Sequence, residues 1–231
     1  MSFILEIAVQ SVESGCAAQD AGADRIELCA NLPEGGVTPS LEMMQSARAA
    51  LSIPIFAMIR PRPGDFVYSN EEFAAMREQI AQAKRAQLDG MVLGVLTADK
   101  EIDVARTSAL VAEAKPLPVT FHRAFDVAGA TAALLEGVIA TGATRLLTSG
   151  GAQSAPQAAS QIRGLIRAAN GRIVVMPGAG INAPNFSELR RATGASEFHA
   201  GLGSVQPYGS TDFSRFSAEI RSIAAQKSDR A

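Results

Sequence analysis

The sequence contains few of the residues on which several classes of protein depend. Its two cysteines, Cys16 and Cys29, are too few for a disulfide framework, so we expect a cytoplasmic protein with reduced thiols. No apolar run approaches the roughly 20 residues of a membrane span. The first residues lack the basic region of a signal peptide. We therefore expect neither a membrane protein nor an exported one.

The absence of a net positive charge and of lysines at strand ends, and the scarcity of histidines, argue against further functions. A net charge of −2 argues against a general nucleic-acid binder, which usually has a basic surface. No lysine ends a predicted strand, which argues against a Schiff-base mechanism. The chain has only 2 histidines and contains no Cys-x-x-Cys or His-Glu-x-x-His pattern. A standard zinc site is therefore not expected.

The apolar residues form a regular pattern along the chain. Eight short apolar runs alternate with alanine-rich segments of helical spacing, at residues 3–9, 25–29, 53–59, 90–96, 117–121, 145–148, 172–176 and 197–199. Strand and helix repeated in this way predict a parallel sheet buried on both faces. We predict a single (β/α)₈ TIM barrel over residues 1–226 and a flexible tail over residues 227–231. A doubly wound open sheet is the alternative.

Several helix ends can also be predicted. Pro39 is expected at the first position of a helix, and residues 69–72 have the pattern of a capping box. Gly22, Gly142 and Gly194 fall where helices are expected to end.

Polar residues gather at the carboxyl ends of the predicted strands, which is the end of a (β/α)₈ barrel that carries active sites. By period-two alternation, four of these residues point into the barrel mouth: Glu6, Glu27, Arg60 and His122. We take Glu27, Arg60, His122 and Arg123 as the candidate catalytic residues. The alternative is an ion network that only fills the lumen. If the cluster is a site, Arg60→Met is expected to cost little stability.

Other residues are candidates for ligand contacts. Arg62 and Asp65 lie on a long loop after the third strand, and Ser149 follows the sixth. Glycine-rich turns at residues 176–182 and 200–204 follow the last two strands, where barrels often bind phosphate. Backbone N–H groups there would cradle an anion, which makes Gly178, Gly180 and Gly201 candidates. Glycine that serves only tight turns is the alternative.

Longer motifs point to a family. They lie at residues 5–7, 22–29, 34–40, 59–62, 64–69, 119–126, 147–150 and 197–199. Together they closely resemble the CutC family, called the copper homeostasis protein family, over nearly the whole chain. The resemblance implies a (β/α)₈ barrel, a cytoplasmic location and a role in copper handling.

One departure from the family pattern concerns the metal. Family members often carry a cysteine where this chain has Ala8. A second thiolate there, beside Cys29, would suit Cu(I). Here Cys29 is the one candidate metal ligand of that pair, with Met58 or His199 as helpers, so Cu(I) binding is expected to be weakened. No organic cofactor is implied.

Three functions remain in view. The first is copper handling, as the resemblance implies. The second is a barrel enzyme for a small anionic or phosphorylated substrate, with Arg60, Arg62 and Arg123 as anion clamps and His122 or Glu27 as acid–base groups. The third is a non-catalytic binding protein that uses the same pocket. No nucleic-acid or membrane partner is expected, and a homo-oligomer is left open.

Overall fold

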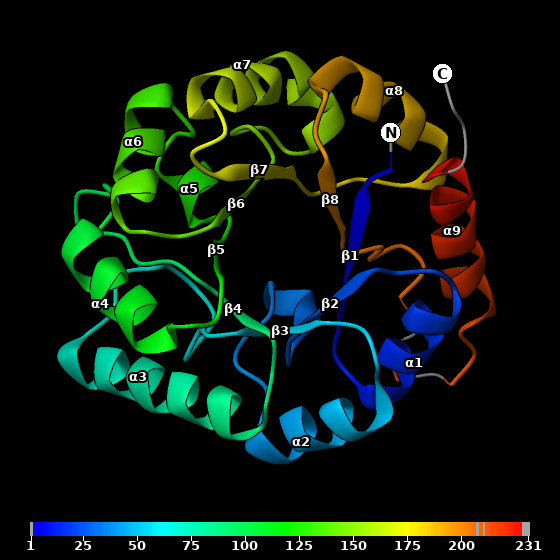
Figure 1. The fold of residues 1–231 in the computed structure, drawn as a ribbon, viewed down its shortest axis with the longest axis horizontal. Coiled ribbons are helices and arrows are strands. Elements are labelled where there is room, and N and C mark those ends of the chain that lie inside the picture. Colours follow the sequence, from blue (N-terminus) through cyan, green and yellow to red (C-terminus); the bar gives the residue numbers. More distant parts are fainter. Residues whose placement is uncertain (1, 207, 210, 228–231) are drawn as a thin grey trace.

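Eight parallel strands form the centre of the molecule. The computed structural model describes residues 2–206, 208–209 and 211–227. The strands pair in the order β7-β6-β5-β4-β3-β2-β1-β8, and a parallel bridge between Gly178 and His199 lies at the remaining seam (Figure 1). The predicted (β/α)₈ barrel is confirmed. The strands are β1 (Ile4–Val9), β2 (Arg25–Leu28), β3 (Ile55–Met58), β4 (Gly90–Leu93), β5 (Val119–Phe121), β6 (Arg145–Thr148), β7 (Val174–Pro177) and β8 (Glu197–Ala200).

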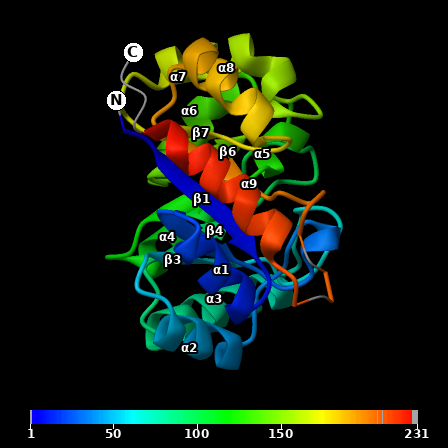
Figure 2. The same cartoon turned by 90° about the vertical axis from the view of Figure 1, so that its right-hand side faces the viewer.

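Helices surround the strands. They are α1 (Val12–Asp20), α2 (Leu41–Ala50), α3 (Asn70–Arg85), α4 (Val104–Ala114), α5 (Ala124–Val127), α6 (Ala132–Ala140), α7 (Ala159–Ala169), α8 (Ala183–Thr193) and α9 (Ser214–Ala224). The described residues also form the short 3₁₀ helices η1 (Leu32–Glu34), η2 (Ala155–Ala158) and η3 (Ala225–Lys227). Helix α9 lies on the outside of the barrel, where it packs against both α1 and α8 (Figure 2). Within the described residues, no helix is long and apolar enough to cross a membrane.

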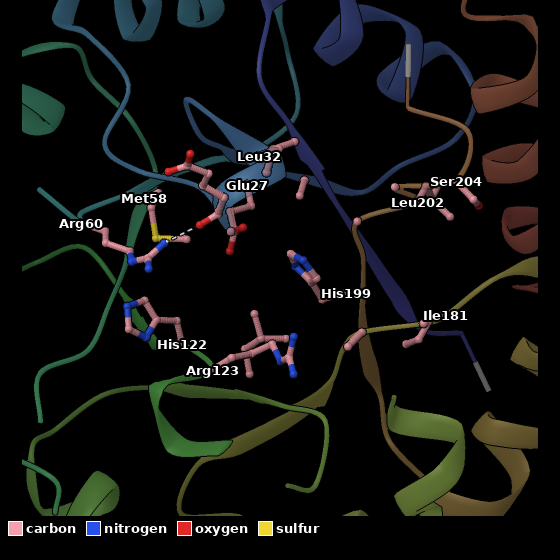
Figure 3. A pocket seen from close by; sticks show the side chains of 18 of the residues that line it. Glu27, Leu32, Met58, Arg60, His122, Arg123, Ile181, His199, Leu202 and Ser204 are labelled. Atoms are coloured by element: carbon pink, nitrogen blue, oxygen red, sulfur yellow. Dashed lines mark hydrogen bonds between the residues drawn. The ribbon is translucent and has the colours of Figure 1, made fainter. Parts of the chain in front are cut away.

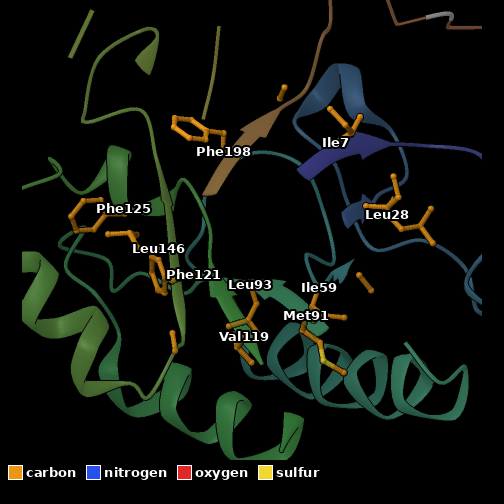
Figure 4. Packing of buried hydrophobic residues seen from close by; sticks show 14 of the residues in the cluster. Ile7, Leu28, Ile59, Met91, Leu93, Val119, Phe121, Phe125, Leu146 and Phe198 are labelled. Atoms are coloured by element: carbon orange, nitrogen blue, oxygen red, sulfur yellow. The ribbon is translucent and has the colours of Figure 1, made fainter. Parts of the chain in front are cut away.

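The core lies between the strands and the helices. Side chains that alternate along each strand point outward, and residues such as Ile7, Leu28 and Phe121 are fully buried there (Figure 4). Burying a side chain of this size contributes about 1.5–3 kcal/mol. The intervening residues point into the lumen, so the second face of each strand is free to carry polar groups.

The helix ends agree with the sequence in all but one case. Ser69 and Glu72 form the predicted capping box of α3, and Gly194 closes α8 in the left-handed conformation. Gly22 and Gly142 directly follow the C-caps of α1 and α6. Pro39 was expected at the first helical position, which is wrong. The Ser40 side chain accepts from the Met43 N–H and caps α2 after the proline.

Lys227, the last described residue, contacts the turn that precedes β2. Lys227 forms an ion pair of 2.6 Å with Asp24 and donates to the Gly22 carbonyl at 2.9 Å. The rest of the predicted tail, residues 228–231, lies outside the described residues.

Candidate functional site

A cavity of about 520 Å³ opens at the carboxyl ends of the strands. The loops after β2, β3, β5, β7 and β8 surround it, as expected for a barrel mouth, and Ala8 of β1 also lines it. Six predicted site residues line this cavity: Glu27, Arg60, His122, Arg123, Gly180 and Gly201. The other predicted residues lie outside the lining: Cys29, Arg62, Asp65, Ser149 and Gly178.

Beneath the cavity, the lumen contains a layer of ion pairs that we call the ion layer: Glu6, Arg25, Arg145 and Glu197. Arg25 binds Glu6 at 2.5 Å and Glu197 at 2.7 Å, while Arg145 binds Glu197 at 2.8 Å. Burial raises the pKa of the Glu6 carboxyl, but Arg25 and His199 outweigh that effect and lower the pKa to about 2. Each charge of this layer therefore has a partner of opposite sign.

Glu6 was predicted from the sequence, but the other three members of the ion layer, Arg25, Arg145 and Glu197, were not. A signal was present, because Arg25 stands two residues before Glu27 and Glu197 two residues before His199. Period-two alternation puts both on the lumen face, one level below the mouth.

Above the ion layer lie Glu27 and His199, which we call the acceptor wall. The His199 Nδ1 atom lies 2.8 Å from Glu6 Oε1, and Glu27 Oε2 is buried without a hydrogen-bond partner among the described residues. Burial raises the pKa of Glu27, and the charge of Glu6 adds to this effect. Burial lowers the pKa of His199, but Glu27 and Glu6 outweigh it and raise that pKa. The wall thus has carboxylate and imidazole groups that are not fully satisfied by the protein.

Across the cavity lie Arg60, His122 and Arg123, which we call the donor wall (Figure 3). The Arg60 guanidinium donates to the backbone carbonyls of Glu34, Gly36 and Gly64 at 2.8–3.1 Å. In the part of the chain that the structure describes, no carboxylate pairs with it, and its Nε–H has no acceptor. Arg60 therefore brings a buried positive charge that only neutral groups surround.

His122 is the second member of the donor wall. Its Nδ1 accepts from the Ala124 N–H at 3.3 Å, so the neutral ring carries its proton on Nε2. Burial and the nearby Arg60 charge lower the pKa of His122 to about 3, which keeps the ring neutral. Gly94 is required beneath it, because a Cβ there would lie 2.7 Å from the imidazole. The Nε2–H has no partner among the residues described.

Arg123 is the most exposed member of the donor wall. Its Nε donates to Asp126 at 2.8 Å and its Nη2 to Ser149 Oγ at 3.2 Å. The side chain remains 43% exposed, which leaves its outer edge accessible to a ligand. Ser149 also donates to Asp126, so its observed role is to position the Arg123 partner.

The charged residues Arg62 and Asp65 of the loop after β3 form ion pairs with nearby residues and do not line the cavity. Arg62 binds Glu72 at 2.6 Å and Asp65 at 2.9 Å, and its guanidinium lies over the Tyr68 ring. The structure thus places Arg62 and Asp65 in a loop brace, away from the cavity lining.

The glycine-rich turns have structural reasons for their glycines. The Gly178 N–H donates to the Thr148 carbonyl, and a Cβ on Gly178 would lie 2.4 Å from Leu147. A Cβ on Gly180 would lie 2.6 Å from Ser154. The first N–H of α8, from Ala183, already donates to the Glu219 carboxylate at 2.6 Å. Of the three glycines predicted to bind an anion, Gly201 is the one with open space beside it, because a Cβ there would meet no atom within 4 Å among the described residues.

Cys29 lies in a small apolar cluster with Phe56, Met58 and Val92. Its Sγ–H donates to Glu27 Oε1 at 3.4 Å. Burial raises the pKa of the thiol well above its usual value, and the Glu27 charge acts in the same direction. A thiol in this setting is a weak metal ligand, because the thiolate is the form that binds metals.

Comparison with known proteins agrees with this architecture. A family model described as the CutC family matches residues 3–204. A CutC family protein of Chromobacterium violaceum is 52% identical over 200 residues, which cover 87% of this chain and 81% of the relative. The human copper homeostasis protein cutC homolog is 47% identical over 207 residues, 90% of this chain and 76% of the relative.

A solved structure shows the same fold. The crystal structure of the CutC protein from Streptococcus agalactiae has a TM-score of 0.81 and 33% identity to this chain. The match covers 86% of this chain and 98% of that one. The motifs, the barrel and these relatives together show that the chain belongs to the CutC family.

Proposed function

We propose that this protein is a barrel enzyme that acts on a small anionic substrate at the mouth of the barrel. The observation that carries this proposal is the division of one cavity into a donor wall and an acceptor wall. A substrate anion would form a direct ion pair with the exposed Arg123 side chain and would be attracted by the nearby positive charge of Arg60. It would also accept a hydrogen bond from the His122 Nε2–H, which has no partner among the described residues. Its other end would then face Glu27 and His199, whose side chains are common proton-transfer groups.

Ligand binding tests this proposal first. We expect inorganic phosphate or small carboxylates to raise the melting temperature of the wild-type protein, since a ligand at 100 times its Kd stabilises by about 2.7 kcal/mol. Arg123→Met should abolish most of this shift. Arg62→Met is the matched control, because its charge is held by Glu72 and Asp65 outside the cavity. Ligands that stabilise the wild type are then incubated with it and followed by mass spectrometry.

Two outcomes would count against the enzyme. The first is a shift in melting temperature that is equal in the wild type and in Arg123→Met, because the anion would then bind elsewhere. The second is full binding with no conversion of any ligand, which supports a binding protein that uses the same cavity.

Copper handling in the cytoplasm is the second candidate function. The name of the human relative favours it, as does the cluster that brings the Cys29 thiol and the Met58 thioether together. Both are soft ligands of the kind that Cu(I) prefers. The fit is weak, since Ala8 lines the cavity where a second thiol would stand and the Cys29 thiol is held protonated.

A titration against a Cu(I) chelator in reducing buffer tests this second function. We expect Ala8→Cys to bind Cu(I) more tightly than the wild type, and Cys29→Ser to bind more weakly. Equal affinities in all three proteins would mean that neither position holds the metal.

A further inference from the structure

Three buried side chains from three neighbouring strands meet at the base of the cavity. Glu6 on β1, Glu27 on β2 and His199 on β8 have ligand atoms that all lie within 4.8 Å of one another. The strand register explains this, because Glu6 pairs with His199 and Ala8 pairs with Glu27. Carboxylate oxygen and imidazole nitrogen are ligands that divalent cations such as Zn²⁺ and Mn²⁺ accept.

Glu27 is the member of this group that the protein leaves unsatisfied. Its side chain is buried, its Oε1 accepts only the weak Cys29 thiol donor, and its Oε2 has no partner among the residues that the structure describes. A buried carboxylate without a partner is costly. Because Glu27 lines the cavity, a cation that enters from the mouth would reach this side chain.

His199 is oriented by the carboxylate behind it. An ionised carboxylate only accepts, so the contact to Glu6 Oε1 assigns the hydrogen to Nδ1 and leaves Nε2 as the second ring nitrogen. The arrangement carboxylate–imidazole–metal is common in metal sites, where the carboxylate fixes the ring orientation and raises its basicity. Glu6 is suited to this supporting role because Arg25 occupies its other oxygen.

The charges of the surroundings also allow a cation. Arg25 and Arg145 are balanced by Glu6 and Glu197 within the ion layer, so their positive charge does not oppose a metal at the level above. Glu27 then remains on the acceptor wall as a buried carboxyl group whose Oε2 atom has no hydrogen-bond partner among the described residues.

We propose that Glu27 and His199 bind a divalent transition-metal cation at the base of the cavity, with Glu6 orienting the imidazole. Two protein ligands leave the remaining coordination positions to water or to an anionic ligand that also reaches the donor wall. That last consequence rests on the proposed enzymatic function, whereas the metal site itself does not.

The test uses the metal alone, in the absence of any anionic substrate. We expect one Zn²⁺ per chain by calorimetry of chelator-treated wild-type protein, and Mn²⁺ at the same site by electron paramagnetic resonance. Glu27→Gln and His199→Gln should each weaken binding by at least tenfold. Glu34→Gln is the matched control, because this exposed carboxylate lies on the rim of the same cavity. Cys29→Ser should retain Zn²⁺ binding, which separates this site from the Cu(I) candidate.

Glu27→Gln preserves side-chain size and removes a carboxylate that forms no ion pair with an arginine or lysine among the described residues, so this variant is expected to fold, and a thermal melt verifies it. No stoichiometric cation in the wild type, or unchanged affinity in folded Glu27→Gln, would overturn the proposal. Because the titration contains no substrate, that failure is distinct from failure of anion binding in Arg123→Met.

Discussion

The ion layer and the two walls above it are both built from buried charged residues, but they differ in how the charges are paired. In the ion layer, each carboxylate contacts an arginine at 2.5–2.8 Å. In the walls, Glu27 Oε2, Arg60 Nε and His122 Nε2 have no partners among the described residues. The first region is satisfied by the protein itself. The second retains buried polar atoms that the protein does not pair, and this difference is the reason why we propose the walls, and not the ion layer, as the ligand site.

The largest effect is expected in the ion layer. Arg25→Met leaves Glu6 and Glu197 without their shared partner and should lower the free energy of unfolding by about 3–5 kcal/mol. Urea denaturation measures this loss. Arg172→Met, which breaks an exposed pair with Glu136, is the control and should change stability little. Similar losses in both variants would remove the distinction between the two levels.

Arg60 sharpens the comparison because it belongs to the donor wall yet also supports the fold. Its contacts reverse the sequence-based expectation that Arg60→Met costs little. Three backbone carbonyls would lose a charged donor, so we expect a loss of roughly 2–4 kcal/mol in unfolding free energy. Arg62→Met should cost less, because its side chain is 36% exposed. If Arg60→Met unfolds at the same denaturant concentration as the wild type, the loops after β2 and β3 do not depend on the Arg60 hydrogen bonds for their stability.

His122 offers a smaller effect that depends on pH. Its pKa is lowered from 6.5 to about 3, so between these two pH values the imidazole binds a proton in the unfolded chain but not in the folded protein. The stability that comes from the neutral ring is therefore complete above pH 6.5 and is lost as the pH falls towards 3. Between pH 6.5 and 5 the loss should be about 2 kcal/mol.

Denaturation of the wild type and of His122→Asn at both pH values measures this contribution. The asparagine oxygen can still accept from Ala124 but does not titrate, so the variant should lack this part of the decline. If the free energy of unfolding falls equally in both proteins between these pH values, a group other than His122 is responsible for the loss.

The fold was predictable because its signals are local. Apolar runs located all eight strands, and the second, sixth and eighth agree with the observed bounds to within one residue. The candidate residues Glu27, Arg60 and His122 were also predictable, since alternation along a strand indicates which side chains face the lumen. Arg123 was predictable from its place at the carboxyl end of the fifth strand. Their catalytic and binding roles remain predictions.

The contacts between strands could not be predicted in the same way. Arg25 and Glu197 are 172 residues apart in sequence, and only the closed barrel brings them together. Likewise, the sequence does not reveal that Arg62 turns back to Glu72, or that Glu219 from α9 reaches the first N–H of α8. A strand pattern predicts the side on which a residue lies, but the choice of partner depends on register and loop path.

The pairing of β1 with β8 has a consequence for how the protein matures. Glu6 on β1 and His199 on β8 lie opposite each other in this strand pair but are separated by 193 positions in the chain. During synthesis the amino-terminal strand must wait for the last strand, and contacts of such long range form slowly. The acceptor wall is therefore completed only after β8 has joined, so a nascent chain that ends before β8 would have much of the barrel but lack half of this wall.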